Sequence, residues 1–243
     1  MDRMLRMGDI PKMNDNIKQI IYEDDTVIVL HKPAGIPVQT SRIGQKDIVS
    51  ILKNYRSQKG EDAYIGLVHR LDQPVEGLFA AAKTPKAAAE LSGQWNSHTA
   101  EKYYRAMVCS HQEAPLMAGS KRTLTDYLLR DGRTNYSKVV KNGTEGAKKA
   151  VLQYEVLQTD GTLAELLIGL ETGRHHQIRV QLANASLPLL GDRKYGQDSS
   201  TDFSLALCSV KISFIHPKSR QKMEFETIPQ NPSFQLLHQV DIA

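Results

Sequence analysis

The chain has 243 residues, of which 40% are hydrophobic, 24% charged and 6% aromatic, and it contains only two cysteines. This composition is typical of a globular protein with its own core, and it excludes a disordered chain, a collagen-like repeat and a disulfide-stapled scaffold. No apolar run approaches the roughly 20 residues that cross a bilayer, and no hydrophobic segment follows the basic start of the chain. We therefore expect a cytoplasmic protein with one large domain.

The first 100 residues predict two buried strands and one helix. Residues 1–16 show no periodicity, and we expect them to form a flexible lead-in. Two short apolar runs, Thr26–Leu30 and Leu78–Ala82, predict buried strands, and the Pro and Gly within His31–Gly35 impose a turn after the first. Thr84-Pro85 sets an N-cap hydroxyl before a proline at the first helical position. The apolar face of this helix is expected to carry Ala87, Ala88, Leu91 and Trp95.

The rest of the chain is richer in strands than in helices. Residues 103–108 alternate as a strand does, and residues 151–157 and 163–170 predict a hairpin around Thr159-Asp160-Gly161. Residues 175–185 carry apolar side chains at helical spacing. Because strands outnumber helices and hairpins outnumber βαβ units, the sequence predicts an α+β fold with a mixed or mainly antiparallel sheet. Further strands are expected at residues 205–213 and 223–227.

Positive charge is concentrated in residues 116–150, which we call the basic segment. The whole chain carries a net charge of +4, whereas this segment alone holds eight Lys or Arg and three acids, a net charge of +5. Charge alone favours a solvated loop with exposed lysines, and the alternative is a surface that contacts phosphates. The eight cations are Lys121, Arg122, Arg130, Arg133, Lys138, Lys141, Lys148 and Lys149.

Three polar clusters are candidates for a functional site, and each also has a purely structural interpretation. His69-Arg70-Leu71-Asp72 sets a carboxylate beside a guanidinium, which could equally be a surface ion pair. Lys102-Tyr103-Tyr104 lies on a strand, so the two tyrosines point to opposite faces and at most one enters a given site. Thr172–Arg179 brings together two arginines and two histidines, or forms the solvated first turn of a helix. No set of side chains has the spacing of a zinc site, so we expect no metal.

These three segments, in this order, resemble motifs of the RluA-like family of RNA pseudouridine synthases. Asp25–Gly35, a strand leading into His-Lys-Pro-Ala-Gly, and Pro188–Gly196 are similar to further segments of that family, so the likeness covers residues 17–230. The resemblance implies a catalytic domain over residues 17–243, without the small N-terminal RNA-binding domain that some members carry. It implies an isomerase that converts uridine in structured RNA, ribosomal RNA first and transfer RNA next, with no cofactor. We further expect a monomer with no obligatory protein partner and no membrane association.

The resemblance also implies roles for individual residues. Asp72 is the implied nucleophile, Arg179 its partner in the closed pocket, and Tyr104 the residue that stacks on the uracil. Arg70 is the implied group that fills the space left by the flipped base. The other implied RNA-binding residues are His69, Arg174, His176, Gln177 and Ile178, to which the charge of the basic segment adds Lys121 and Arg122.

The sequence departs from the family pattern at Glu76, His175 and Gln181, the last standing where His is frequent, and two other functions stay open. Glu76 stands where the family commonly has a small hydroxyl residue, and a carboxylate beside bound RNA would repel phosphate. His175 replaces a common Thr or Ser. One alternative function is an RNA-binding module of the same fold without turnover. The other is a hydrolase that pairs Asp72 with His69 or His176.

Overall fold

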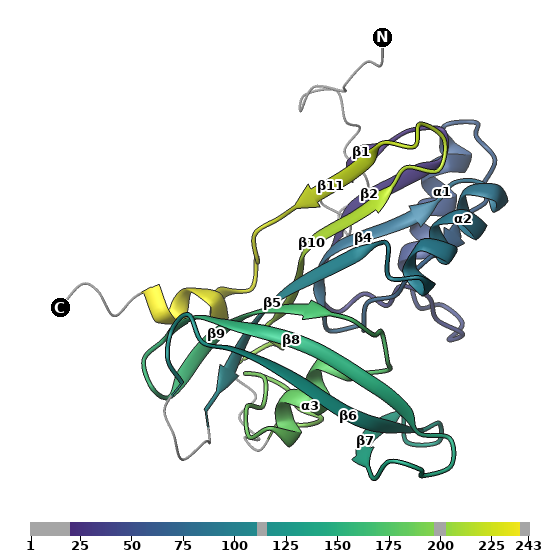
Figure 1. The fold of residues 1–243 in the computed structure, drawn as a ribbon. Coiled ribbons are helices and arrows are strands. Elements are labelled where there is room, and N and C mark those ends of the chain that lie inside the picture. The colour runs from purple at the N-terminus through teal and green to yellow at the C-terminus, as the bar shows by residue number, and fades with distance from the viewer. Residues whose placement is uncertain (1–19, 111–115, 197–202, 239–243) are drawn as a thin grey trace. The chain divides into compact units, whose positions relative to one another are not determined.

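The computed structural model describes residues 20–110, 116–196 and 203–238 (Figure 1). No helix among them is long and apolar enough to cross a membrane. The lead-in expected at residues 1–16 lies outside the described residues, and the domain boundary expected at residue 17 stays a prediction.

The chain forms two compact units. Residues up to Thr99 together with residues 214–223 make the N-terminal unit, and residues 100–213 together with those from Glu224 onward make the C-terminal unit. The chain therefore passes from one unit to the other three times. The N-terminal unit is consequently discontinuous in sequence, and we call residues 214–223 its return segment.

The N-terminal unit combines a small antiparallel sheet with two helices. Every residue of β2 and β4 is buried, which confirms the two strands predicted from apolar runs. The predicted helix start is also confirmed, because Thr84 Oγ1 accepts a hydrogen bond from Ala87 N at 3.2 Å. The strand order is β1-β2-β4, with β3 also paired to β4. The elements are β1 (Ile20–Glu23), β2 (Val27–Lys32), α1 (Ile48–Gln58), β3 (Gly66–Leu67), β4 (Glu76–Ala82) and α2 (Pro85–Asn96).

The return segment completes the N-terminal unit through contacts with residues far away in sequence. The side-chain amide of Gln94, in α2, donates to Ile215 O and accepts from Ile215 N, both at 2.7 Å. His216 Nε2 lies 2.8 Å from Asp24 Oδ2. The ring of Phe214 packs against Trp95 with the ring centroids 5.8 Å apart. Residues 20–99 therefore depend on the return segment for part of their packing.

The C-terminal unit is built on a larger antiparallel sheet. Its strand order is β10-β5-β9-β8-β6-β7, and β11 pairs with β10. The β8–β9 hairpin confirms the prediction made from the Thr159-Asp160-Gly161 turn. The last two residues of β10 belong to the return segment. The elements are β5 (Glu101–Cys109), β6 (Lys121–Asp131), β7 (Tyr136–Val140), β8 (Lys148–Thr159), β9 (Leu163–Leu170), α3 (Gln177–Asn184), β10 (Leu207–Ile215), β11 (Lys222–Glu226) and η1 (Pro232–His238).

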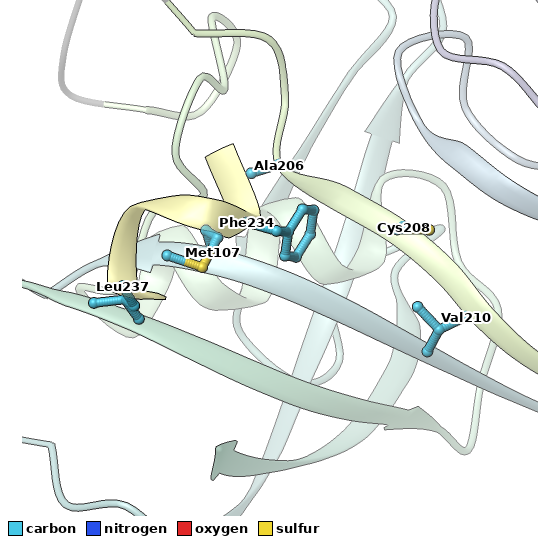
Figure 2. Packing of buried hydrophobic residues seen from close by; sticks show 6 residues of the cluster. All are labelled: Met107, Ala206, Cys208, Val210, Phe234 and Leu237. Atoms are coloured by element: carbon cyan, nitrogen blue, oxygen red, sulfur yellow. The ribbon is translucent and has the colours of Figure 1, made fainter. Parts of the chain in front are cut away.

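The sheet of the C-terminal unit has two faces, which we name after the helices that pack on them. On the α3 face, Val180 packs against Leu128 and Ala150. On the η1 face, buried apolar side chains gather beneath η1 (Figure 2). Because side chains alternate along a strand, each strand position belongs to one face or the other. The η1-face cluster consists of Met107, Ala206, Cys208, Val210, Phe234 and Leu237.

Two expectations about the C-terminal unit are corrected. The basic segment is not a solvated loop, because it forms β6, β7 and the first residues of β8, with all eight cations exposed. The helix expected at residues 175–185 begins at Gln177, since His176 takes a left-handed backbone conformation with φ of 54°. A residue in that conformation cannot continue the helix toward its N-terminus.

Candidate active site

Asp72 lies in the loop between β3 and β4, half-buried and fastened on both sides. Its own carbonyl accepts a hydrogen bond from Val75 N at 3.0 Å, which closes a turn. The next residue, Gln73, is bound to the turn after β2, because its carbonyl accepts from Gly35 N at 2.8 Å and its amide donates to Gly35 O at 2.9 Å. The carboxylate that the sequence singled out is therefore presented from a loop tied to a neighbouring turn.

A fully buried lysine completes this fastening. Lys32 Nζ donates to the carbonyls of Pro33 and Ile36 at 2.8 Å and to that of Gln73 at 3.2 Å. Burial lowers the pKa of Lys32 to about 7, while the negative charges of Asp72 and Glu76 act to raise it. Lys32 thus ties the Asp72 loop to the turn at residues 33–36 and, when protonated, sets a positive charge facing the carboxylate.

Glu76, the unusual residue in this region, is buried at the start of β4. Its Oε2 atom lies 3.9 Å from His31 Nε2, and its charge acts on Lys32. The carboxylate therefore faces two basic groups within the N-terminal unit. The concern that it would repel phosphate does not apply to a buried side chain arranged in this way.

The ring of His69 is buried in the N-terminal unit, and its contact with RNA stays a prediction. Nε2 accepts a hydrogen bond from Ala80 N at 2.9 Å, so in the neutral ring the proton is on Nδ1. The ring also stacks on Trp95, with the centroids 5.0 Å apart and the planes 3° from parallel. His69 therefore joins the start of the Asp72 loop to β4 and α2. Its neighbour Arg70 is exposed, and its proposed contact with RNA stays a prediction.

Tyr104 and Tyr103 point to opposite faces of the C-terminal sheet, as predicted. Tyr103 packs against the η1-face cluster. Tyr104 is buried on the α3 face, directly opposite Ile168 of β9 and Ser209 of β10. Of the two tyrosines, Tyr104 therefore shares a face with the helix that carries Arg179. Its role in stacking on uracil stays a prediction.

Arg179 is buried in α3 and held by a carboxylate that the sequence analysis did not single out. Its Nε donates to Asp192 Oδ2 at 2.8 Å and its Nη2 to Asp192 Oδ1 at 2.6 Å, a bidentate pair. Burial raises the pKa of Asp192, but the hydrogen bonds and charge of Arg179 outweigh it and hold that pKa below its usual range. The signal for Asp192 was present, since it lies in the family-like segment Pro188–Gly196. The predicted pairing of Arg179 with Asp72 stays a prediction.

His176 is held by its neighbours just before α3, and its contact with RNA stays a prediction. The buried ring stacks on His175 with the centroids 3.7 Å apart, and Nδ1 lies 2.7 Å from the hydroxyl of Tyr195. Burial and the charges of Arg179, His175 and Lys194 lower the pKa of His176 to about 3. The ring is therefore neutral at physiological pH and fixes the residues just before α3.

Gln177 is likewise structural, because both ends of its buried side chain are used within the unit. Oε1 accepts from Thr172 Oγ1 at 2.8 Å and from Arg174 N at 2.9 Å, and Nε2 donates to Val151 O at 3.0 Å. Ile178 is also buried. Arg174 is exposed, with Nε bonded to Lys149 O at 2.9 Å, so a contact with RNA stays a prediction for this residue.

Lys121 and Arg122 are adjacent in β6 but lie on different faces of the sheet. Lys121 is directly opposite Glu155 and pairs with it at 3.0 Å. Arg122 is directly opposite Tyr154, which lies on the α3 face with Ala150. The two side chains therefore point to opposite faces, and contact with RNA stays a prediction for both. Among the described residues, no three His, Cys, Asp or Glu side chains gather to hold a metal ion.

Comparison with known proteins supplies a family for this geometry. A family model described as RNA pseudouridylate synthase matches residues 26–184. The chain is 31% identical over 235 residues to "Ribosomal large subunit pseudouridine synthase D" of Zymomonas mobilis, covering 88% of this chain and 70% of that protein. It is 32% identical over 231 residues to the protein of the same name from Neisseria meningitidis serogroup B, covering 90% and 60%.

The fold is similar to that of a solved human protein described as "RNA Pseudouridylate Synthase Domain Containing 4". The TM-score is 0.68 at 23% sequence identity, with 87% of this chain and 88% of that chain covered. This likeness supports the α+β fold. The chain spans between 60% and 70% of the length of the two bacterial relatives.

Proposed function

The chain belongs to the RNA pseudouridylate synthase family, and from this premise we propose that it isomerises uridine to pseudouridine within structured RNA. Ribosomal RNA is the first candidate substrate, because the bacterial relatives are named for the large ribosomal subunit, and transfer RNA is the next. The observation that carries the proposal is the fastened Asp72 loop, in which the buried Lys32 faces the carboxylate.

The proposed reaction uses the Asp72 carboxylate to break the bond between N1 of uracil and C1′ of ribose. The detached uracil turns, and C5 forms a new bond to C1′. The hydrogen on C5 leaves as a proton and N1 gains a proton, so the RNA keeps its mass and no oxidant or reductant is consumed. A fastened loop suits this task, since the carboxylate must keep its position while the base moves.

Tyr104 and Arg179 are the other proposed participants. In the proposal, Tyr104 stacks on the uracil, and Arg179 pairs with Asp72 when the pocket excludes water. Asp192 is a positioning residue, because its bidentate bond to Arg179 sets the direction of the guanidinium. The exposed Arg70 is proposed to fill the gap left by the extruded base, a step that costs a few kcal/mol of unstacking.

The hydrolase alternative loses its support at the two histidines it requires. His69 accepts from a backbone amide in the core of the N-terminal unit, and His176 is held neutral beside Tyr195. Neither ring is arranged to activate water for attack. An RNA-binding module without turnover would bind the same RNA but release no tritium from uridine C5, which distinguishes it from the isomerase.

Tritium release tests the proposal directly. Ribosomal and transfer RNA labelled with tritium at uridine C5, prepared from cells lacking the protein, are incubated with wild type, Asp72→Asn and Asp62→Asn. Asp62 is an exposed carboxylate of the same unit, so its variant controls for the lost charge. We expect release by wild type and Asp62→Asn only, from RNA of unchanged mass. Full release by Asp72→Asn would refute the mechanism, free uracil would indicate a hydrolase, and binding without release would indicate the RNA-binding module.

A further inference from the structure

The exposed cations of the basic segment divide between the two faces of the sheet. Because directly opposite residues of antiparallel strands point to the same face, strand pairing assigns each position. Arg122 is opposite Tyr154, Arg130 is opposite Ser137, and Lys148 is opposite Leu128, and these positions belong to the α3 face. Lys121 of β6, Lys138 of β7 and Lys149 of β8 are at alternating positions and belong to the η1 face.

The α3-face cations lie on the same face as Tyr104. Arg122 is opposite Tyr154, Tyr154 is opposite Ile168, and Ile168 is opposite Tyr104, with no register shift between these pairs. The row crosses from β6 through β8 and β9 to β5. At about 4.8 Å between neighbouring strands, the backbone of Arg122 lies roughly 14 Å from that of Tyr104. Tyr154, Ile168 and Tyr104 are themselves buried, so Arg122 is the exposed member of a row that ends at the tyrosine.

The η1 face differs from the α3 face in how its cations are paired. Lys121 is paired with Glu155 at 3.0 Å, which neutralises one of its three cations. Across β5 and β10 the same face is covered by η1, where Phe234 and Leu237 pack on the η1-face cluster. In contrast, Arg122, Arg130 and Lys148 have no carboxylate within ion-pair distance among the described residues.

The end of the β6–β7 hairpin is fixed to the segments around α3. Ser137 N donates to the Tyr195 hydroxyl at 2.9 Å, and Ser137 Oγ lies 2.9 Å from His175 Nδ1. His175 Nε2 lies 3.0 Å from Asn135 Oδ1, and Lys194 Nζ donates to Asn135 O at 2.7 Å. The hairpin is thus held in a defined position relative to α3, so its cations form a preorganised surface.

We propose that the α3 face of β6 and β8 is an RNA-binding surface on which Arg122, Arg130 and Lys148 bind phosphates of the strand whose uridine reaches Tyr104. The surface rests on the proposed function for its choice of partner. The phosphate backbone is the ligand, so the contacts carry affinity and position rather than sequence preference.

Two matched triple variants test the choice of face. One is Arg122→Gln, Arg130→Gln and Lys148→Gln, and the other is Lys121→Gln, Lys138→Gln and Lys149→Gln. Each removes three exposed charges from β6, β7 and β8 taken together, so net charge is matched, and circular dichroism verifies that both variants fold. The single variants Arg122→Gln and Lys121→Gln repeat the comparison at adjacent positions.

Binding of a fluorescein-labelled RNA stem-loop of about 30 nucleotides is measured by anisotropy over a salt series. For the α3-face triple, we expect the slope of log K against log salt to fall by about 2 to 3, and the affinity near 0.15 M salt to drop at least about tenfold. For the η1-face triple, we expect a slope change below about 0.5.

Equal losses in the two triples would overturn the proposal, because net charge would then explain binding. A larger loss in the η1-face triple, or no binding by wild type, would also overturn it. The assay needs no turnover, so it separates the two proposals. If wild type releases no tritium but the α3-face triple alone loses binding, the RNA-binding surface is supported and the proposed isomerase is refuted. If wild type releases tritium and the two triples bind RNA alike, the isomerase is supported and the RNA-binding surface is refuted.

Discussion

Replacing Lys32 by Met should change how the stability of the protein depends on pH. Burial lowers the pKa of this fully buried lysine from 10.5 to about 7, whereas in the unfolded chain it titrates near its ordinary value. Between these two values the unfolded chain binds the proton and the folded chain does not, so stability rises with pH. Below pH 7 both forms are protonated and the full cost of burying the charge is present. That cost corresponds to about 5 kcal/mol.

The prediction is a difference between two unfolding curves. Urea denaturation of wild type and Lys32→Met at pH 7, 8, 9 and 10 gives the free energy of unfolding of each. The wild-type value should gain on that of the variant by up to about 1.4 kcal/mol per pH unit, the limit for one proton. Lys102, whose pKa burial lowers to about 8, titrates in both proteins and cancels in the difference. The control Lys86→Met removes an exposed lysine and should show no such trend.

A difference between wild type and Lys32→Met that stays constant from pH 7 to pH 10 would refute this account. It would mean that the ammonium group is as well solvated in the folded chain as in the unfolded one. The carbonyl contacts of Lys32 would then be its whole contribution.

Three further predictions concern neighbours of the site. Glu76→Gln removes one of two charges that raise the pKa of Lys32, so the rise in stability should begin below pH 7, and an unchanged onset in a urea series extended down to pH 5 would contradict this. Asp192→Asn removes the bidentate carboxylate from Arg179 and should lower the free energy of unfolding by about 3 kcal/mol. It should also abolish most of the tritium release while stem-loop binding persists, and release at the wild-type level would contradict this. His69→Phe removes the acceptor for Ala80 N and should lower the free energy of unfolding by about 1 to 3 kcal/mol without weakening stem-loop binding. A loss of binding at unchanged stability would instead identify His69 as an RNA contact.

Where local chemistry decides the fold, the sequence predicted it. Val27–Lys32 and Glu76–Ala82 are buried on both faces, so their apolar runs predict strands without any information about tertiary contacts. Thr84 and Pro85 specify a helix start by themselves. Helix α1 was missed although its signal was present, since Asp47 caps it by accepting from Ser50 N at 2.7 Å.

The strands of the basic segment were missed for a different reason. In β6 the η1-face positions are Lys121, Thr123, Thr125, Tyr127, Leu129 and Asp131, of which only Leu129 is aliphatic. Polar residues also occupy much of the α3 face, so the period-2 pattern of hydrophobicity is weak. Pairing between strands depends on tertiary structure. Composition alone therefore indicated only a run of charged residues here and not strands.

The residues of the site were predicted better than their partners. Asp72, Tyr104 and Arg179 came from motifs, but the Asp192–Arg179 pair joins positions 13 residues apart whose contact depends on the fold. The burial of the two histidines was not predicted, because a sequence records their chemistry and not their surroundings. Only the structure shows that His69 stacks on Trp95 and that His176 lies against Tyr195.

The return segment has a consequence for how the protein is made. The Gln94 side chain finds both of its backbone partners at Ile215, and Trp95 finds Phe214, so the first unit cannot finish packing when its own 99 residues have been synthesised. More than a hundred further residues must be translated before those contacts form. During that interval Trp95 and its neighbours stay incompletely covered on the nascent chain, where exposed apolar surface favours chaperone binding. Packing of the N-terminal unit should therefore finish only after the return segment has been synthesised.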